Sequence, residues 1–382
     1  MVRAESRLIL PNRPDSLVPL LAFAREKALQ VGFDAQGVKE VELALEEMAS
    51  NVVEHAYEPG EEAAYVVGLD RKPGQFVLSV EDAGHPLDLQ AIQAGLRGSL
   101  GLLLVGAFAD EIRFTSPGTR GKRMEAVKDL PYADVRRGLT DEDRKAAAAG
   151  FKVAGEPLEV RPLSSRDGPA AARCAFRAFG FSDDRAFLYV PERLREMEAC
   201  GLVQGRVAVA GDEIAGAVLA AREEQKSRVG VAGPCVADPR FEQKDLEAPL
   251  FRALLEGLQE EGWYGLALKL APAPGALGAL ADLGARETGF LFGEGLSYGA
   301  ARVEGEAQGP RRTALLAYVK LAEEPHREVY PPLHHAGMIR RIYERLALRR
   351  EVREVRTRHV LEDLPPCSRL DVEVRPRFKE AR

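Results

Sequence analysis

Residues 41–57 read VELALEEMASNVVEHAY, a segment with two stripes of side chains at helical spacing. The apolar stripe consists of Val41, Leu45, Met48 and Val52. Apolar residues that recur every three or four positions predict a helix with one buried face. Glu47, Asn51 and His55 form a polar stripe on another face, each one turn further on. Polar residues at this spacing most often face solvent, so the helix alone indicates no function.

Length and composition indicate a globular protein with more than one domain. The chain has 382 residues, of which 46% are hydrophobic and 29% charged, as in folded rather than disordered proteins. Its formal net charge of -6 offers no basic footprint, so we expect no direct binding to nucleic acid. The four cysteines are scattered without Cys-x-x-Cys spacing, which indicates reduced thiols rather than a zinc site or a disulfide framework.

The sequence also lacks the patterns of membrane and secreted proteins. Its longest apolar run, around residues 100–109, is too short for a membrane-spanning helix. The first residues lack the apolar core of a signal peptide. We therefore expect a cytoplasmic protein that does not contact a membrane.

Residues 1–130 combine helical and strand patterns. Strands are expected at 7–11, 64–70, 75–81, 110–115 and 123–128, and helices at 15–31 and from Asp34 onward. Turn sequences at 71–74 and 116–121 join two pairs of these strands into hairpins. The predicted fold class is therefore α+β: an N-terminal α/β sandwich in which helices cover an antiparallel sheet.

Three further regions follow this first domain. Residues 131–156 are charged, rich in alanine and poor in large apolar side chains, which is typical of a linker, and a short helix is expected within them. Residues 157–322 alternate between strand and helix patterns and predict a second α/β domain. Residues 323–382 form a C-terminal extension that ends in an alternating strand at 370–378. The expected partner of that strand is the sheet of the second domain or another chain.

Two glycine-containing motifs follow the helix of residues 41–57. Asp82-x-Gly84-x-Pro86 comes at the end of a predicted strand, and Gly98-x-x-Gly101 precedes an apolar run. Neither a P-loop nor a Gly-x-Gly-x-x-Gly motif is present. In this order and together with the helix, the two motifs resemble those of the Bergerat-fold (GHKL) ATPases, and within them the anti-sigma-factor serine/threonine kinases. The proline of the first motif favours that group over sensor histidine kinases.

The resemblance implies roles for two residues of the polar stripe. An asparagine of this helix binds magnesium in the family, and Asn51 matches it; an amide oxygen is a hard ligand suited to Mg²⁺. The glutamate one turn earlier acts as base toward water or an acceptor hydroxyl, and Glu47 matches it. His55 has no such role and is expected to be structural or exposed.

The resemblance also implies contacts between the glycine motifs and the nucleotide. Asp82 matches the aspartate that accepts a hydrogen bond from the adenine amino group, and Gly84 lets the base approach the backbone. Gly98 and Gly101 match the second glycine box, where backbone amides and a helix N-terminus hold phosphates. Taken singly, the first motif is a plain Asx turn and the later glycines are helix-entry residues without a ligand. Lys122 stands where a polar amide is common, a departure that assigns it no role.

The second domain resembles the GNAT-type N-acyltransferases. The matching segments are residues 159–162, 207–216 and 236–240, the last of which leads into a long helix. In active members, an Arg/Gln-x-x-Gly-x-Gly/Ala loop wraps the pyrophosphate of acyl-CoA at that helix N-terminus. Here Gln243 and Asp245 stand at the glycine positions, and Glu242 adds negative charge. We therefore expect a degenerate GNAT-like domain for which acetyl-CoA is not a cofactor.

Three functions are compatible with these patterns. The leading hypothesis is an ATP-binding regulatory protein that resembles an anti-sigma kinase and uses ATP and Mg²⁺ to phosphorylate a protein partner, or sequesters it. The resemblance implies an anti-anti-sigma-like antagonist or a sigma-like factor as partner, and a homodimer. One alternative is an N-acyltransferase regulated by the nucleotide-binding domain. The other is a non-catalytic, ATP-dependent switch.

Overall fold

The computed structural model describes residues 6–85, 100–116, 121–149, 158–181, 183, 185–211, 213–233, 235–241, 246–270, 278–295, 312–331, 333–353 and 370–374. The chain divides into two compact units. Unit 1 consists of Met1–Pro131 and His359–Arg382, and unit 2 of Tyr132–Arg358.

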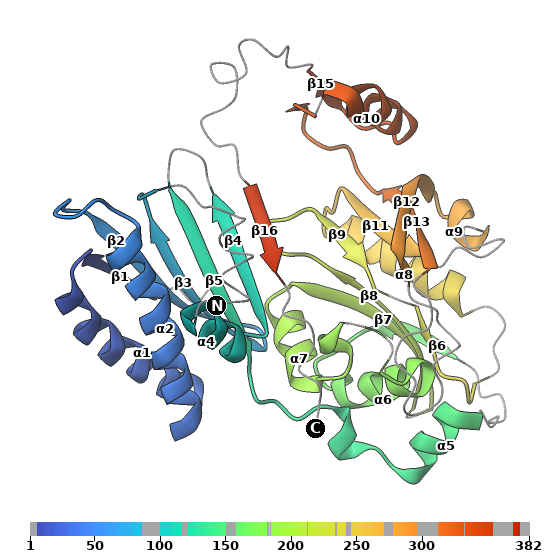
Figure 1. The fold of residues 1–382 in the computed structure, drawn as a ribbon. Coiled ribbons are helices and arrows are strands. Elements are labelled where there is room, and N and C mark those ends of the chain that lie inside the picture. The colour runs from blue at the N-terminus through green and yellow to red at the C-terminus, as the bar shows by residue number, and fades with distance from the viewer. Residues whose placement is uncertain are drawn as a thin grey trace. The chain divides into compact units, whose positions relative to one another are not determined.

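Unit 1 is a sheet with helices on one face (Figure 1). Its strands are β1 (Ser6–Pro11), β2 (Ala64–Lys72), β3 (Gln75–Asp82), β4 (Glu111–Ser116), β5 (Lys122–Asp129) and β16 (Leu370–Val374). Their order in the sheet is β1-β2-β3-β5-β4-β16, and every neighbouring pair is antiparallel. The helices are α1 (Leu17–Val31), α2 (Ala35–His55) and α4 (Leu100–Phe108). This arrangement confirms the predicted α+β sandwich.

Helix α2 is the helix predicted from the apolar stripe. Asp34 caps its first turn, because the Asp34 carboxylate accepts a hydrogen bond from the backbone N–H of Gly37 at 2.8 Å. All four residues of the apolar stripe are buried. Through its packing, α2 contacts α1, α4 and β3 and is the central helix of the layer.

Helix α1 starts without a side-chain cap. Ser16 occupies the N-cap position, but its hydroxyl makes no capping hydrogen bond. It donates instead to the carbonyl oxygen of Arg13 at 2.6 Å and lies 3.0 Å from the hydroxyl of Tyr65. A short 3₁₀ turn, Pro14–Ser16, precedes the helix and directs the hydroxyl toward the sheet.

The strand near the C-terminus has a different partner from the two that were expected. β16 pairs with β4, so that Leu370 lies opposite Ser116 and Val374 lies opposite Ile112. The other long edge of β4 pairs with β5, and β16 therefore covers the remaining backbone groups of β4. Residues 375–378 of the predicted strand lie outside the described residues.

Unit 2 contains a mixed sheet with helices. Its helices are α5 (Asp141–Ala149), α6 (Gly168–Phe179), α7 (Pro191–Ala199), α8 (Glu247–Glu260) and α9 (Gly278–Asp282). The strands are β6 (Glu159–Pro162), β7 (Val203–Ala210), β8 (Glu213–Ala221), β9 (Val229–Ala232), β10 (Val236–Ala237), β11 (Gly265–Leu270), β12 (Arg286–Gly295) and β13 (Arg312–Lys320). The sheet order is β12-β13-β11-β9-β8-β7-β6, with β9 and β11 parallel.

β9 and β10 are two short strands with different partners. β9 pairs with β8 and β11, whereas β10 pairs antiparallel with β8, with Val236 opposite Ala217. Helix α8 then covers the sheet with its apolar face, in which Leu250, Leu254 and Leu258 are fully buried beside Trp263. Strands and helices thus alternate along unit 2, as predicted for an α/β domain.

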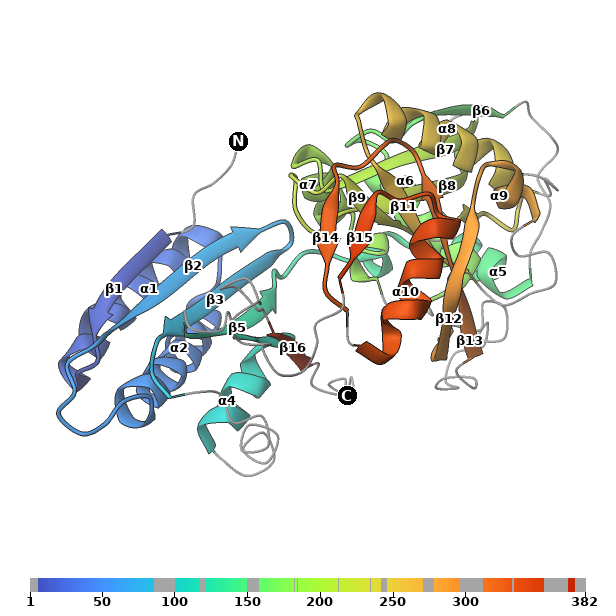
Figure 2. The ribbon, with the colours of Figure 1, turned by 90° about the horizontal axis from the view of Figure 1, so that it is seen from above.

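Two segments outside the predicted second domain also belong to unit 2. Val135 is part of a core cluster with residues of α6 and β7, and α5 packs against α6, so described residues of the expected linker are built into this unit. After the main sheet come β14 (Arg327–Val329), α10 (Leu333–Arg345) and β15 (Arg350–Val352) (Figure 2). β14 and β15 pair in parallel as a small separate sheet.

Within the described ranges, the helices fall short of the combined length and apolar character that crossing a bilayer requires.

Candidate nucleotide site and a buried ion network

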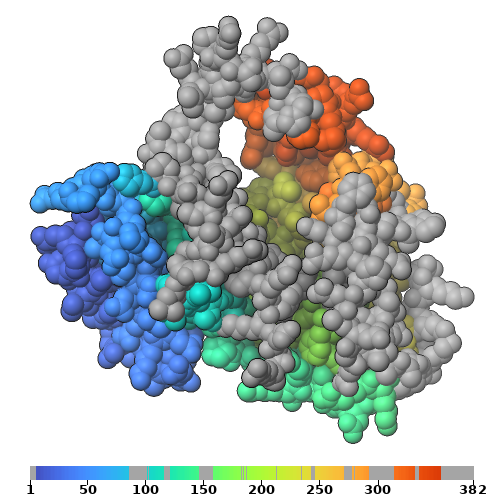
Figure 3. Space-filling model, in the orientation of Figure 1, coloured from blue at the N-terminus to red at the C-terminus, as the bar shows by residue number. Residues whose placement is uncertain are grey.

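Helices α2 and α4 bring one glutamate and one glycine of the predicted site together. Glu47 is half-buried on α2, and Asn51 is exposed one turn further on. Gly101 lies in the first turn of α4, where an added Cβ would fall 2.3 Å from Glu47 Oε2. The carboxylate of Glu47 therefore lies against the α4 backbone. Figure 3 shows the helical face of unit 1, with α1 and α2 in blue.

Asp82, at the end of β3, is buried with 5% of its surface exposed. Its Oδ1 accepts a hydrogen bond from the backbone N–H of Gly84 at 2.9 Å, which is an Asx turn. The same oxygen accepts a second bond from Nζ of Lys122 at 2.5 Å. Asp82 and Lys122 are directly opposite each other on β3 and β5, so the ion pair follows from the register of the sheet. A buried carboxylate is stabilised by such a cation.

The turn after Asp82 is fixed against the end of α2. The N–H of His85 donates to the carbonyl oxygen of Ala56 at 2.7 Å. A Cβ on Gly84 would lie 2.0 Å from that oxygen, so the turn can approach the helix this closely because the residue is glycine. Tyr57 adds a second link, because its hydroxyl oxygen accepts a hydrogen bond from the N–H of Ala83 at 3.1 Å, and burial raises the pKa of this phenol.

These contacts connect several of the predicted site residues through one helix. α2 carries Glu47 and Asn51, and its C-terminal end holds the turn of Asp82 and Gly84. Gly98, by contrast, lies outside the described residues, as does the proline of the first motif. The sequence analysis assigned no role to Lys122, which the register between β3 and β5 places opposite Asp82. No local sequence pattern indicates this pairing.

The donor set fits a magnesium nucleotide. The carboxamide of Asn51 and the carboxylate of Glu47 provide oxygen ligands of the type that Mg²⁺ prefers. Asp82 provides a buried carboxylate in which, among the described residues, Oδ2 accepts no hydrogen bond. This arrangement can accept a hydrogen bond from a base at one end and hold a cation at the other.

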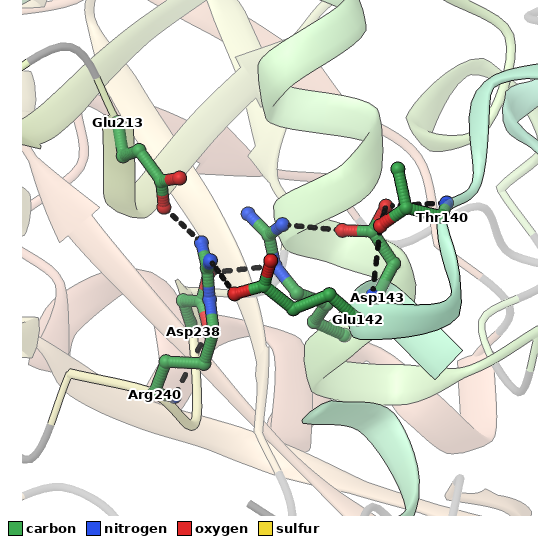
Figure 4. Close-up of polar contacts among 7 residues, drawn as sticks. Thr140, Glu142, Asp143, Glu213, Asp238 and Arg240 are labelled. Carbon is green, nitrogen blue, oxygen red and sulfur yellow. Dashed lines mark hydrogen bonds and ion pairs between the residues drawn. The ribbon is translucent and has the colours of Figure 1, made fainter. Parts of the chain in front are cut away.

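Unit 2 contains a separate cluster of buried charges around Arg240, the residue that matches the first position of the acyl-CoA loop (Figure 4). Arg240 Nη2 lies 3.0 Å from Asp238 Oδ2 and also contacts the carboxylate of Glu213. Its Nη1 lies 3.6 Å from Glu142 Oε1. Burial alone would lower the pKa of Arg240, but Asp238 and Glu213 raise it. The guanidinium is thus engaged by three carboxylates from within the chain; residues 242–245 lie outside the described part.

A second arginine ties α5 into this cluster. Nη1 of Arg177, on α6, donates to Oδ1 of Asp143 at 2.5 Å, and its Nε lies 2.7 Å from Oδ2 of Asp238. Thr140 caps the helix by exchanging hydrogen bonds with Asp143, at 2.8 and 2.9 Å to Oδ2. Burial opposes ionisation of Asp143, but the bonds from Thr140 and Arg177 outweigh it and lower its pKa.

Comparison with family models identifies the first domain. Residues 10–128 match the model of the histidine kinase-like ATPase domain. The matched region contains Glu47, Asn51, Asp82, Gly84, Gly98 and Gly101. The predicted Bergerat-type ATPase domain at the N-terminus is therefore confirmed, and this domain is of an ATP-binding type.

Solved structures similar to the chain are acetyltransferases. The ribosomal-protein-S18-alanine N-acetyltransferase of Escherichia coli is 16% identical with a TM-score of 0.34, and covers 44% of this chain and 97% of its own. The ribosomal-protein-S5-alanine acetyltransferase of Vibrio fischeri is 16% identical with a TM-score of 0.34 (46% and 100% covered). A GNAT-family acetyltransferase of Streptococcus pneumoniae is 17% identical, with a TM-score of 0.35 (44% and 100%). TM-scores in this range support no inference about activity. Comparison with curated proteins finds no match.

Proposed function

We propose that the protein is an ATP-dependent regulator of the anti-sigma-kinase type, which phosphorylates a serine or threonine of a protein partner. The observation that supports this most is the position of α2. One helix carries Glu47 and Asn51, and its end fixes the turn that contains Asp82. A general base, a cation ligand and a carboxylate that can bind adenine are thus attached to one rigid helix, as phosphoryl transfer requires.

Each residue has a distinct task in this proposal. The Asp82 carboxylate accepts a hydrogen bond from the amino group of adenine, and Glu47 accepts the proton of the attacking hydroxyl. Asn51 holds Mg²⁺, which when bound neutralises charge on the phosphates. By the resemblance, Gly98 and Gly101 offer backbone N–H groups to the phosphates.

The test of nucleotide binding is a thermal-shift titration of the full chain with Mg-ATP. Wild type is stabilised as the concentration rises, because ligand binds the folded state. Asp82→Asn loses this stabilisation, since an amide nitrogen then faces the adenine amino group. Asp110→Asn is the matched control, because Asp110, like Asp82, pairs with a lysine of β5: its Oδ2 lies 3.2 Å from Nζ of Lys128. If Asp82→Asn shifts as much as wild type, the proposal is wrong.

A second variant separates the kinase from a non-catalytic switch. Glu47→Gln should keep the thermal shift with Mg-ATP but release phosphate about 100-fold more slowly than wild type, because the base is lost. No phosphate release by either protein would favour the switch, and equal release by both would exclude Glu47 as the base. The partner, an anti-anti-sigma-like antagonist or a sigma-like factor, and the homodimer remain predictions.

The N-acyltransferase reading has less support. The guanidinium of Arg240, which would face the pyrophosphate of acyl-CoA by resemblance, is already surrounded by Asp238, Glu213 and Glu142. An anion that approached it would have to displace these carboxylates. We therefore assign the regulatory chemistry to unit 1.

A further inference from the structure

We propose that Lys122 is a base-reading residue: its ammonium donates a hydrogen bond to ring nitrogen N1 of adenine, while Asp82 accepts one from the neighbouring amino group. The inference rests on the proposed nucleotide site and adds to it a residue that selects the base.

The two side chains form a fixed pair at the ends of β3 and β5. The side chain of Lys122 is 17% exposed and that of Asp82 is 4% exposed. Besides its 2.5 Å contact with Asp82 Oδ1, Lys122 Nζ donates to the carbonyl oxygen of His85 at 2.7 Å. The ammonium is therefore held by one acceptor at each end of the turn formed by residues 82–85.

Gly121 brings the start of β5 close to this turn. It has a φ of +103°, and a Cβ added to it would lie 2.1 Å from the carbonyl oxygen of Asp82. A residue with a side chain could not bring β5 this close. The position of Lys122, the next residue, is therefore set by the backbone as well as by the ion pair.

The Lys122–Asp82 pair leaves one ammonium N–H and one carboxylate oxygen available for a ligand. An ammonium has three N–H bonds, and within the described residues two of those on Lys122 have acceptors. The carboxylate oxygen Oδ2 of Asp82 likewise accepts no hydrogen bond there. The edge of adenine presents the complementary order, a ring-nitrogen acceptor next to an amino donor. Because the charges of Lys122 and Asp82 cancel, the pair can face an uncharged base without a net buried charge.

The experiment measures calorimetric dissociation constants of the full chain for four magnesium nucleotides: ATP, 1-deaza-ATP, 7-deaza-ATP and purine riboside triphosphate. The 1-deaza analogue lacks N1, and the purine analogue lacks the amino group. Wild type should bind 1-deaza-ATP about tenfold more weakly than ATP, because it lacks one hydrogen bond from a charged donor. The 7-deaza analogue, altered away from this edge, should bind within about twofold of ATP.

Lys122→Met should weaken ATP binding about tenfold and remove the difference between ATP and 1-deaza-ATP. Lys128→Met is the matched control, because Lys128 is on the same strand, is 19% exposed and pairs with Asp110. This control should keep the wild-type preference for ATP over 1-deaza-ATP. The comparison of analogues on wild type needs no variant, so a folding defect in Lys122→Met leaves the test intact.

Two results would overturn the inference while leaving the proposed function in place. One is equal affinity of wild type for ATP and 1-deaza-ATP. The other is tighter ATP binding by Lys122→Met, which would mean that the ammonium competes with the base for Asp82. Failure of wild type to bind any of the four nucleotides would overturn the proposed function, and this inference with it.

Discussion

Gly101 of α4 lies so close to Glu47 of α2 that a Cβ on the glycine would fall 2.3 Å from the Oε2 atom of the glutamate. The contact is with the end of a flexible side chain rather than with backbone. A methyl group at this position would therefore move the carboxylate before it moved either helix.

Gly101→Ala should thus impair catalysis without unfolding unit 1. Displacement of the Glu47 carboxylate should slow phosphate release from Mg-ATP about 10- to 100-fold, because a base displaced by about an ångström is poorly aligned. Stability should be equal or slightly higher, since alanine favours a helix more than glycine does. Gly106→Ala, in the same helix with open space around the position, is the control. Normal phosphate release by Gly101→Ala would show that Glu47 is not the base.

Gly84→Ala, by contrast, should destabilise unit 1. Its Cβ would fall 2.0 Å from the carbonyl oxygen of Ala56, a backbone atom that cannot move away as a side chain can. We expect a loss of about 1–3 kcal/mol in the free energy of unfolding, measured by urea denaturation. Unchanged stability would mean that the turn after Asp82 is not fixed to the end of α2.

Asp143→Asn should destabilise unit 2 in a pH-dependent manner. The variant loses the charge that Arg177 contacts, which should cost about 2 kcal/mol at pH 7. The pKa of Asp143 is lowered in the folded protein from its ordinary value of 3.8. Its stabilisation is therefore present above pH 3.8 and is lost as the pH falls through the lowered value.

Urea denaturation of wild type and Asp143→Asn between pH 7 and pH 3 measures this effect, and the difference between the two proteins should begin to shrink as the pH falls below 3.8. Glu142→Gln is the control, because Glu142 is exposed on the same helix and lies 3.6 Å from Arg240. Because the Glu142 side chain is exposed to solvent, its contact with the buried Arg240 should contribute only about 0–1 kcal/mol. A constant difference between wild type and Asp143→Asn at every pH would contradict the ion-pair explanation.

Acetyl-CoA should give no binding heat with the full chain. Arg240 is 3% exposed and its guanidinium already contacts three carboxylates, so a pyrophosphate would meet negative charge there. Calorimetry with millimolar acetyl-CoA measures this, with Mg-ATP as the positive ligand. A saturable heat from acetyl-CoA would restore the acyltransferase hypothesis.

The local elements of the fold could be predicted from sequence because their signals are local. The buried stripe of α2 and the Asp34 cap define that helix, and the alternating hairpin of β2 and β3 has a turn at Gly74 with a φ of +67°. Both depend on residues within a few positions of one another. The register that places Lys122 opposite Asp82 joins residues 40 positions apart, and no local pattern indicates it.

Other features depend on contacts between residues far apart in the sequence, which the composition of a segment does not indicate. Residues 131–156 are poor in large apolar side chains, yet Val135 enters a core cluster and Asp143 makes a buried ion pair. This buried ion pair joins two residues that are 34 positions apart, and such a pair produces no periodic pattern in the sequence. The partner of β16 was missed for the same reason, since strand pairing across most of the chain is set by the free edge of β4.

The pairing of β16 with β4 determines the order in which the first sheet can be completed during synthesis. A ribosome makes β1 to β5 first, then all of unit 2, and only afterwards the residues that cover the edge of β4. Through that interval the edge presents unpaired N–H and C=O groups that any extended segment could occupy. The last contact that can form in the nascent first domain is thus the one that completes its sheet, and it must wait until unit 2 has been translated.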